Sequence, residues 1–290
     1  MIDHEILFIS GDAQHKFASS LLRKEKFLES AEAIKLLSEL GERQRVEKKD
    51  LESYIVTIQD GVGLVNISGA LTNDDCSYNR YYDLLSYDEI IRAISDLVNH
   101  DVKAALFNFD TPGGEGGKMI DVADMISNLP FPTVAHTSTS MCSAGYFVGC
   151  QADHVYSNEM ASVGSVGVYL KVGDFSQMYS SMGITFERFR SGDLKATGDP
   201  AFKLTDKEKK FLKDRVANLA DKFYSIVSSA RGIPIELLMK SEIPSGRTFS
   251  GREAVANYLV DGIQSYEKSC MKVVQLANES VDNVNQYRLT

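Results

Sequence analysis

Cysteine, histidine and long apolar runs are all scarce in this sequence, and each scarcity excludes a class of protein. The 290 residues include four cysteines and five histidines. The cysteines have neither the paired spacing of a zinc site nor the density of a disulfide-stapled scaffold; they are Cys76, Cys142, Cys150 and Cys270. We therefore expect reduced thiols, no bound metal and no cofactor.

Positive charge is also in deficit. Lysine and arginine number 31 against 40 acidic residues, which leaves a formal net charge of -9. A protein that binds nucleic acid through its phosphates needs the opposite balance, so no nucleic-acid partner is expected. No basic segment followed by an apolar run opens the chain, and no stretch approaches the roughly 20 apolar residues of a membrane span. The sequence thus predicts a cytoplasmic protein without a membrane anchor.

What the sequence does contain is enough apolar material for a large core. Hydrophobic residues make up 43% of the chain, and a chain of this length buries roughly three quarters of its unfolded surface. We interpret residues 1–52 as a helical arm and linker, residues 53–277 as the main domain, and residues 278–290 as a C-terminal tail. For the arm, a solvated helical hairpin with no role beyond packing is the alternative.

Strand and helix patterns alternate through the main domain. Residues 54–58 and 62–67 flank an Asp-Gly turn and predict a hairpin. Capping-box patterns at Ser86 and Thr205 predict two helices, the second running toward Arg231. Further strands are expected at residues 102–109, 133–135, 154–156, 165–172 and 185–189. This alternation is typical of a mostly parallel α/β sheet.

Three short segments carry residues that a plain sheet does not require. Gly113 and Gly114 follow a buried strand, where backbone N–H groups can approach a developing anion. A tight turn is the ordinary alternative for this pair. Ser143 has small neighbours that leave its hydroxyl approachable at a helix start, although a helix-capping serine fits the same pattern. Lys195 follows a glycine turn, and it can act as a base if burial lowers the pKa of its amine; otherwise it is a surface lysine.

Six segments, in this order, carry a resemblance. They are Asp-Thr-Pro-Gly-Gly at 110–114, Ser-Ala-Gly-Tyr at 143–146, Ala-Asp-His-Val at 152–155, Val-Gly-Ser-Val-Gly-Val at 163–168, Ser-Gly-Asp-Leu-Lys at 191–195 and Gly-Arg-Thr-Phe-Ser-Gly-Arg-Glu-Ala at 246–254. Together they resemble the signal peptide peptidase A family of serine peptidases, including its phage branch of prohead (capsid maturation) proteases. The resemblance runs from about Val62 to Val274.

The resemblance implies an α/β fold of the Clp-protease/crotonase-like type, with stacked βαβ units that often assemble into rings. It assigns the nucleophile to Ser143, the general base to Lys195, and the oxyanion hole to the backbone N–H groups of Gly114 and Ala144. It also assigns substrate binding to Gly113, Gly164 and Ser165. The implied partners are a peptide or protein substrate, such as a scaffold or coat protein, and further copies of the chain in a homo-oligomeric ring. A phage protein would act in the host cytoplasm or the assembling capsid.

One departure and several alternatives accompany this interpretation. Glu115 follows the glycine pair where relatives place apolar or small residues. His136 is the one histidine placed to serve a Ser-His-Asp triad, and Cys142 is a rival nucleophile. A soluble, signal-peptide-peptidase-like housekeeping enzyme is the alternative role. A crotonase-like acyl-CoA enzyme and an inactive assembly scaffold are the other function classes.

Overall fold

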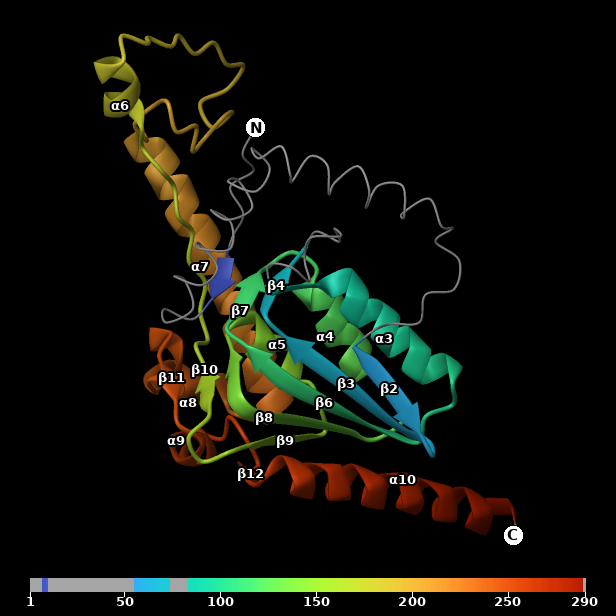
Figure 1. The fold of residues 1–290 in the computed structure, drawn as a ribbon. Coiled ribbons are helices and arrows are strands. Elements are labelled where there is room, and N and C mark those ends of the chain that lie inside the picture. The colour runs from blue at the N-terminus through green and yellow to red at the C-terminus, as the bar shows by residue number, and fades with distance from the viewer. Residues whose placement is uncertain (1–6, 10–54, 74–82, 289–290) are drawn as a thin grey trace, which may run out of the picture.

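The computed structural model describes residues 7–9, 55–73 and 83–288. Its centre is a mostly parallel sheet in the order β11-β10-β8-β6-β3-β2, with β9 beside β8 and β12 beside β9 (Figure 1). The strands are β2 (Val56–Gln59), β3 (Val62–Ser68), β6 (Ala104–Thr111), β8 (Thr133–Cys142), β9 (His154–Ser157), β10 (Ser162–Gly164), β11 (Thr248–Phe249) and β12 (Gly262–Ile263). Only the β2–β3 and β10–β11 pairs are antiparallel in this sheet.

A second, smaller sheet continues from the first. Its strands are β1 (Leu7–Ile9), β4 (Ala70–Thr72), β5 (Leu84–Ser86) and β7 (Gly113–Glu115), in the order β1-β7-β4-β5. β3 passes into β4 through Gly69, and β6 passes into β7 through Gly113, and both glycines have positive φ, at 88° and 98°. Because glycine adopts such angles without a Cβ clash, both chains can bend between the two sheets.

Helices cover both faces of the central sheet. They are α3 (Tyr87–Asn99), α4 (Met119–Ser127), α5 (Ala144–Gly149), α6 (Ser176–Ser181), α7 (Asp206–Arg231), α8 (Ile235–Lys240), α9 (Gly251–Ala256) and α10 (Tyr266–Arg288), with a 3-10 turn, η3 (Ile243–Ser245). In Figure 1, α3, α4 and α5 lie above the sheet and α10 lies below it. Among the described residues, no helix combines the length and apolar content needed to cross a bilayer.

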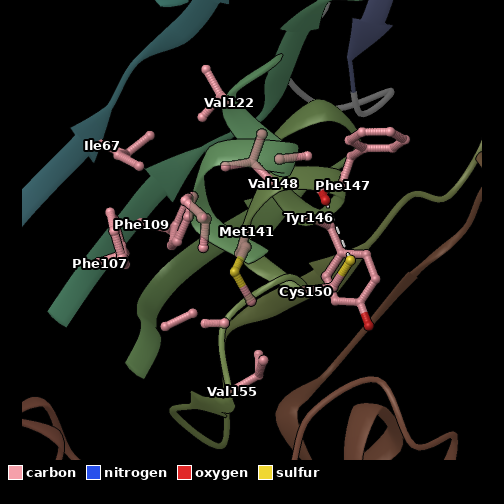
Figure 2. Close-up of a cluster of buried hydrophobic side chains, with 14 of the residues drawn as sticks. Ile67, Phe107, Phe109, Val122, Met141, Tyr146, Phe147, Val148, Cys150 and Val155 are labelled. Carbon is pink, nitrogen blue, oxygen red and sulfur yellow. Dashed lines mark hydrogen bonds between the residues drawn. The ribbon is translucent and has the colours of Figure 1, made fainter. Parts of the chain in front are cut away.

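The side chains of β6 divide between two cores, as strand alternation requires. Phe107 and Phe109 pack into the larger cluster with α3, α4 and α5, and Figure 2 shows Phe109 near Met141 in this cluster. Ala104 and Leu106 face the other way, and they pack with side chains of α10. The sheet is therefore buried on both faces, which is typical of parallel sheets.

The structure confirms the predicted α/β class and several of its local signals. β2 and β3 form the expected hairpin, Ser86 accepts the Glu89 N–H at the start of α3, and Thr205 and Glu208 form a complete capping box. α7 ends at Arg231, where the sequence predicted it. α10 continues without a break across the boundary placed at residue 277. The predicted helical arm lies outside the described residues, apart from β1.

Two predicted strands were wrong. Residues 165–172 are irregular apart from an isolated bridge, and the strand at this place is β10, which ends at Gly164. Residues 185–189 are also irregular. They lie in the segment between α6 and α7, which projects away from the sheet (Figure 1). Because a strand needs a neighbour for its backbone groups, an apolar pattern without one does not form a strand.

Candidate active site

Ser143 lies at the junction where β8 ends and α5 begins, in a conformation that non-glycine residues avoid. Its φ is 51° and its ψ is -119°. Such a backbone costs a residue with a Cβ about 1–3 kcal/mol, and strain of this kind gathers at functional sites. The residue is 1% exposed, yet its hydroxyl makes no capping bond to α5. Helix capping therefore does not account for this serine.

Backbone hydrogen bonds from β10 hold the serine in place. The Ser143 N–H donates to the carbonyl of Gly164 over 2.7 Å, and the N–H of the next residue, Ser165, donates to the carbonyl of Arg247 over 2.9 Å. Gly164 and Ser165 both have positive φ, at 106° and 52°. Gly164, one of the three residues expected to bind substrate, thus also supports the backbone of Ser143.

The paired glycines lie at the same sheet edge as Ser143. β6 and β8 are parallel and pair Thr111 with Met141. Gly113 and Ser143 each follow two residues later, so both lie just beyond the paired residues at the same end of the sheet. A Cβ added at Gly145 would lie 2.3 Å from Cγ2 of Thr111, so α5 approaches the glycine turn closely. The Thr111 hydroxyl accepts the Gly113 N–H over 3.1 Å and donates to a carbonyl of the β3–β4 bend.

Two backbone donors lie next to this junction. Gly114 is the central residue of β7, and β7 packs against α5. Ala144 is the first residue of α5, so its N–H has no acceptor within the helix. The structure therefore places Ala144 directly after Ser143, and Gly114 on the strand that packs against α5.

Glu115, which departs from the family pattern, is buried and bonded within the small sheet. One carboxylate oxygen accepts the Thr72 hydroxyl over 3.1 Å and the Asn73 N–H over 2.7 Å. Its carbonyl accepts the hydroxyl of Tyr87 over 2.5 Å, and burial together with the Glu115 charge raises the pKa of Tyr87. Glu115 thus ties β7 to β4 and α3. Sequence reasoning identified the glutamate as unusual but did not find these partners.

Lys195 lies apart from Ser143. It is exposed and follows a turn in which its N–H donates to the Gly192 carbonyl. Two ion pairs hold its segment to the first turn of α7: Arg190 to buried Glu208 at 2.6 Å, and Asp193 to Lys207 at 2.7 Å. α7 packs against α5 through its C-terminal half, where the Phe223 ring lies edge-on against Phe147 and Arg231 lies near Tyr146. Fifteen residues of helix, about 22 Å, separate Glu208 from Phe223, so this chain does not bring the expected base to its own serine.

The histidine alternative has no geometric support. His136 is fully buried, with Nδ1 2.9 Å from the Ser269 hydroxyl of α10 and Nε2 3.1 Å from the Ser138 hydroxyl. Burial lowers the pKa of His136 to about 4. Both ring nitrogens are thus engaged with hydroxyls other than that of Ser143. The rival nucleophile Cys142 is buried, and its thiol donates to the Ser162 carbonyl at 3.4 Å.

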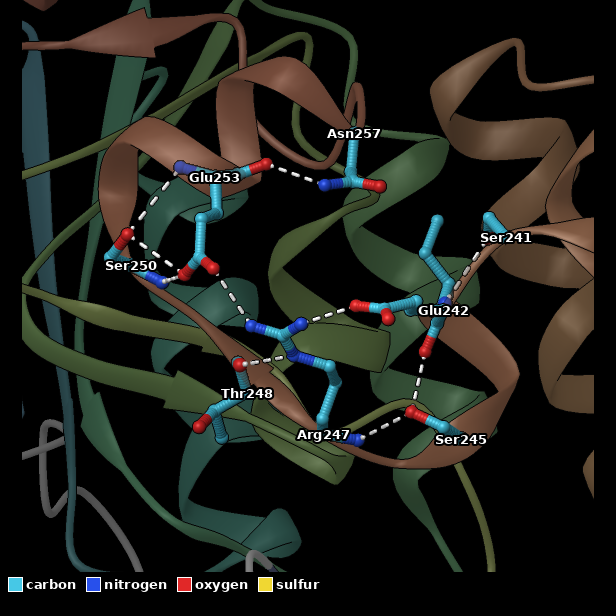
Figure 3. Close-up of polar contacts among 9 residues, drawn as sticks. Ser241, Glu242, Ser245, Arg247, Thr248, Ser250, Glu253 and Asn257 are labelled. Atoms are coloured by element: carbon cyan, nitrogen blue, oxygen red, sulfur yellow. Dashed lines mark hydrogen bonds and ion pairs between the residues drawn. The ribbon is translucent and has the colours of Figure 1, made fainter.

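A polar cluster surrounds Arg247, just before β11 (Figure 3). The Arg247 guanidinium pairs with Glu242 and, at 2.8 Å, with Glu253, and it lies 4.7 Å from the centre of the Phe249 ring. Ser250 and Glu253 form a capping box at the start of α9, and the hydrogen bonds from Ser250 lower the pKa of Glu253. This cluster fixes the segment whose carbonyl accepts the Ser165 N–H. Among the described residues, no group of side chains is arranged to hold a metal ion.

Comparisons with known proteins agree with the resemblance seen in the sequence. The model of Peptidase family S49 matches residues 129–280, more than half of the chain. The putative signal peptide peptidase SppA of Enterococcus faecium is 28% identical over 165 residues, which cover 56% of this chain and 47% of that protein. Capsid assembly protease C of Escherichia phage lambda is 25% identical over 207 residues, which cover 70% and 46%. This chain thus spans about half the length of these two relatives.

Among solved structures, a mutant of ClpP1 from Listeria monocytogenes is similar with a TM-score of 0.47 and 12% identity, over 71% of this chain and 93% of that one.

Proposed function

This chain belongs to peptidase family S49, and from that membership we propose that it is a serine endopeptidase whose nucleophile is Ser143 and whose general base is Lys195. The observation that carries the proposal is the strained, buried backbone of Ser143, whose hydroxyl makes no capping bond to α5. A helix start beside two glycines is where an acyl-transfer nucleophile needs to lie, because backbone donors can then surround the developing oxyanion.

The proposed reaction uses an acyl-enzyme. The Ser143 Oγ attacks the scissile carbonyl carbon while the neutral Lys195 amine accepts the hydroxyl proton. The N–H groups of Gly114 and Ala144 stabilise the tetrahedral oxyanion, each contributing about 3 kcal/mol. The lysine then gives its proton to the leaving amine, the peptide bond breaks, and water hydrolyses the ester at Ser143. A free amine has a pKa near ~10.4, so the assembled site must lower the lysine pKa by removing water or adding positive charge.

We place the assembly of this dyad between copies of the chain. The segment that carries Lys195 is held to the outer end of α7, about 22 Å of helix away from α5. The region from α6 to this segment also exposes large apolar side chains, as an interface would; they are Phe175, Met178, Met182, Ile184, Phe186 and Phe189. A neighbouring copy that covers these side chains can receive Lys195 next to its own Ser143. Such head-to-tail contacts close into a ring.

Mixing two inactive variants tests the shared site. Ser143→Ala and Lys195→Ala are each expected to lose nearly all peptide hydrolysis, because a nucleophile and its base act as a unit. After dissociation and joint reassembly at equal amounts, about one quarter of wild-type activity should return, since one interface in four pairs an intact serine with an intact lysine. Failure of the mixture to recover, with assembly intact, would contradict a base supplied by a neighbour.

A reactive probe tests the nucleophile separately from the dyad. A fluorophosphonate should label Ser143 in the wild-type protein, and labelling should be lost in Ser143→Ala and Lys195→Ala. His136→Ala is the control, because its ring contacts other hydroxyls, and it should retain labelling. Full hydrolysis by the Lys195→Ala variant would refute the lysine as base.

For the biological role, we propose trimming of a scaffold or coat protein during phage capsid assembly. The named phage lambda relative, whose match covers 70% of this chain, supports this role. Incubation with the scaffold and coat proteins encoded beside its own gene should yield Ser143-dependent cleavage of one of them. If both remain intact while signal-like apolar peptides are cut, the housekeeping role that the SppA relative suggests is the correct one.

A further inference from the structure

The first strand of the chain lies on the strand that carries the glycine pair. β1 pairs with β7 in antiparallel register, with Leu7 opposite Glu115, Phe8 opposite Gly114 and Ile9 opposite Gly113. β7 has β4 on its other side, so β1 takes the one edge of β7 that the rest of the small sheet leaves open. More than 100 residues of chain separate these two strands, so this pairing does not come from local folding.

This edge is where a peptide substrate would bind. An open strand edge captures an extended peptide through backbone hydrogen bonds, whatever the peptide sequence. β7 packs directly against α5, which begins one residue after Ser143. A peptide paired with β7 would therefore lie beside the proposed nucleophile and its backbone donors.

The direction of β1 also fits a substrate. Because the pairing is antiparallel, the chain runs from the Glu115 end of β7 toward Gly113. Gly113 is the end that follows Thr111, and Thr111 pairs with Met141, two residues before Ser143. A peptide in this register delivers the bond after its last paired residue to the end of β7 nearest the nucleophile.

We infer that β1 is an internal ligand of the peptide-binding edge, which excludes substrates from β7 while it is bound. The inference rests on the proposed peptidase function and adds to it a self-inhibiting segment. It also assigns the edge a ligand class, extended peptides with consecutive apolar residues, because the bound segment reads Leu-Phe-Ile. A tethered ligand acts at a high effective concentration, so weak pairing is enough to occupy the edge.

Two variants remove β1 from the edge of β7 in different ways. Deletion of residues 1–10 removes β1, and Phe8→Pro keeps the chain length but removes a backbone N–H and disfavours strand pairing. A proline three positions before Leu7, His4→Pro, is the matched control. If β1 occupies the edge nine tenths of the time, release lowers the KM for a peptide substrate about tenfold, with little change in kcat. An unchanged KM in both releasing variants would overturn the inference.

A binding measurement keeps this inference separate from the peptidase proposal. A fluorescent peptide with the sequence of residues 3–12 should bind the deletion variant carrying Ser143→Ala, and should not bind full-length Ser143→Ala. A scrambled peptide of the same composition should bind more weakly. Equal binding of the peptide to the full-length and shortened proteins refutes occupancy by β1. If the peptide binds as expected but no variant hydrolyses any peptide, the self-ligand stands and the peptidase function fails.

Discussion

Replacement of Gly114 by alanine adds one methyl group to β7, the strand that carries one of the proposed oxyanion donors. The substitution therefore tests how closely β7 packs against β4. A Cβ built at Gly114 lies 1.9 Å from the backbone carbonyl oxygen of Leu71. Real Cβ atoms essentially never approach closer than 3.0 Å, so β7 must move by about 1.1 Å or rotate away from β4. A backbone carbonyl cannot turn aside as a flexible side chain can.

The expected loss follows from this displacement. Misplacing a catalytic group by about 1 Å costs about 100-fold, and removing one oxyanion donor costs about 100- to 1,000-fold in kcat. We therefore expect kcat to fall about 100- to 1,000-fold in Gly114→Ala. The overlap should also reduce the free energy of unfolding by about 1–3 kcal/mol.

The assay compares kcat, KM and thermal unfolding with those of a matched variant. Gly262→Ala adds the same methyl group where its nearest neighbour would be a Tyr156 ring carbon at 3.7 Å, an ordinary contact, and it should behave as wild type. If folded Gly114→Ala keeps kcat within about threefold of wild type, the role of the Gly114 N–H in the oxyanion hole is refuted.

Three further predictions concern the residues around the site. Ser143→Gly should be about 1 kcal/mol more stable than Ser143→Ala in denaturant unfolding, because only alanine keeps a Cβ at φ 51°; equal stabilities would show that the serine is unstrained. Glu115→Ala should lose about 2 kcal/mol of unfolding free energy as well as activity, since it removes the acceptor of the Thr72 hydroxyl and Asn73 N–H; Glu115→Gln keeps an acceptor and should lose less. His136 has a pKa of about 4 when folded, below its ordinary 6.5, so the folded state binds fewer protons and stability should fall as pH drops from 6.5 to 4. His136→Gln should flatten this part of the stability profile.

Local signals in the sequence located most elements of the fold. The turn at Asp60 and Gly61 and the capping residues Ser86 and Thr205 predicted elements that the structure contains. These signals succeed because a turn or a cap depends on residues a few positions apart. The pattern at residues 185–189 failed because a strand also depends on a distant neighbour, and the projecting segment has none.

The residues of the candidate site could be proposed from the sequence, but the contacts that hold them in place could not. The motifs supplied Gly114 and Ser143 as candidates, and the parallel pairing of β6 with β8 brings the glycine turn and the serine to the same end of the sheet. The support from Gly164 to Ser143 and the burial of Glu115 depend on contacts between segments far apart in the chain, which residue patterns do not encode. The spacing of Ser143 and Lys195 resembles the family, yet the ion pairs of Arg190 and Asp193 hold the lysine segment away from the serine. The Ser-Lys dyad therefore stays a prediction.

The hydrogen bond from Ser143 to Gly164 has a consequence for the order in which the protein becomes active. Gly164 belongs to β10, and β10 pairs with β8 on one side and with β11, at residues 248–249, on the other. A nascent chain that has not yet reached β11 lacks one of the two strands that hold the serine backbone in its strained conformation. A reactive serine therefore requires β11, which lies more than 100 residues further along the chain. We expect the serine of a nascent chain to stay unreactive until residues 248–249 have been synthesised and paired with β10.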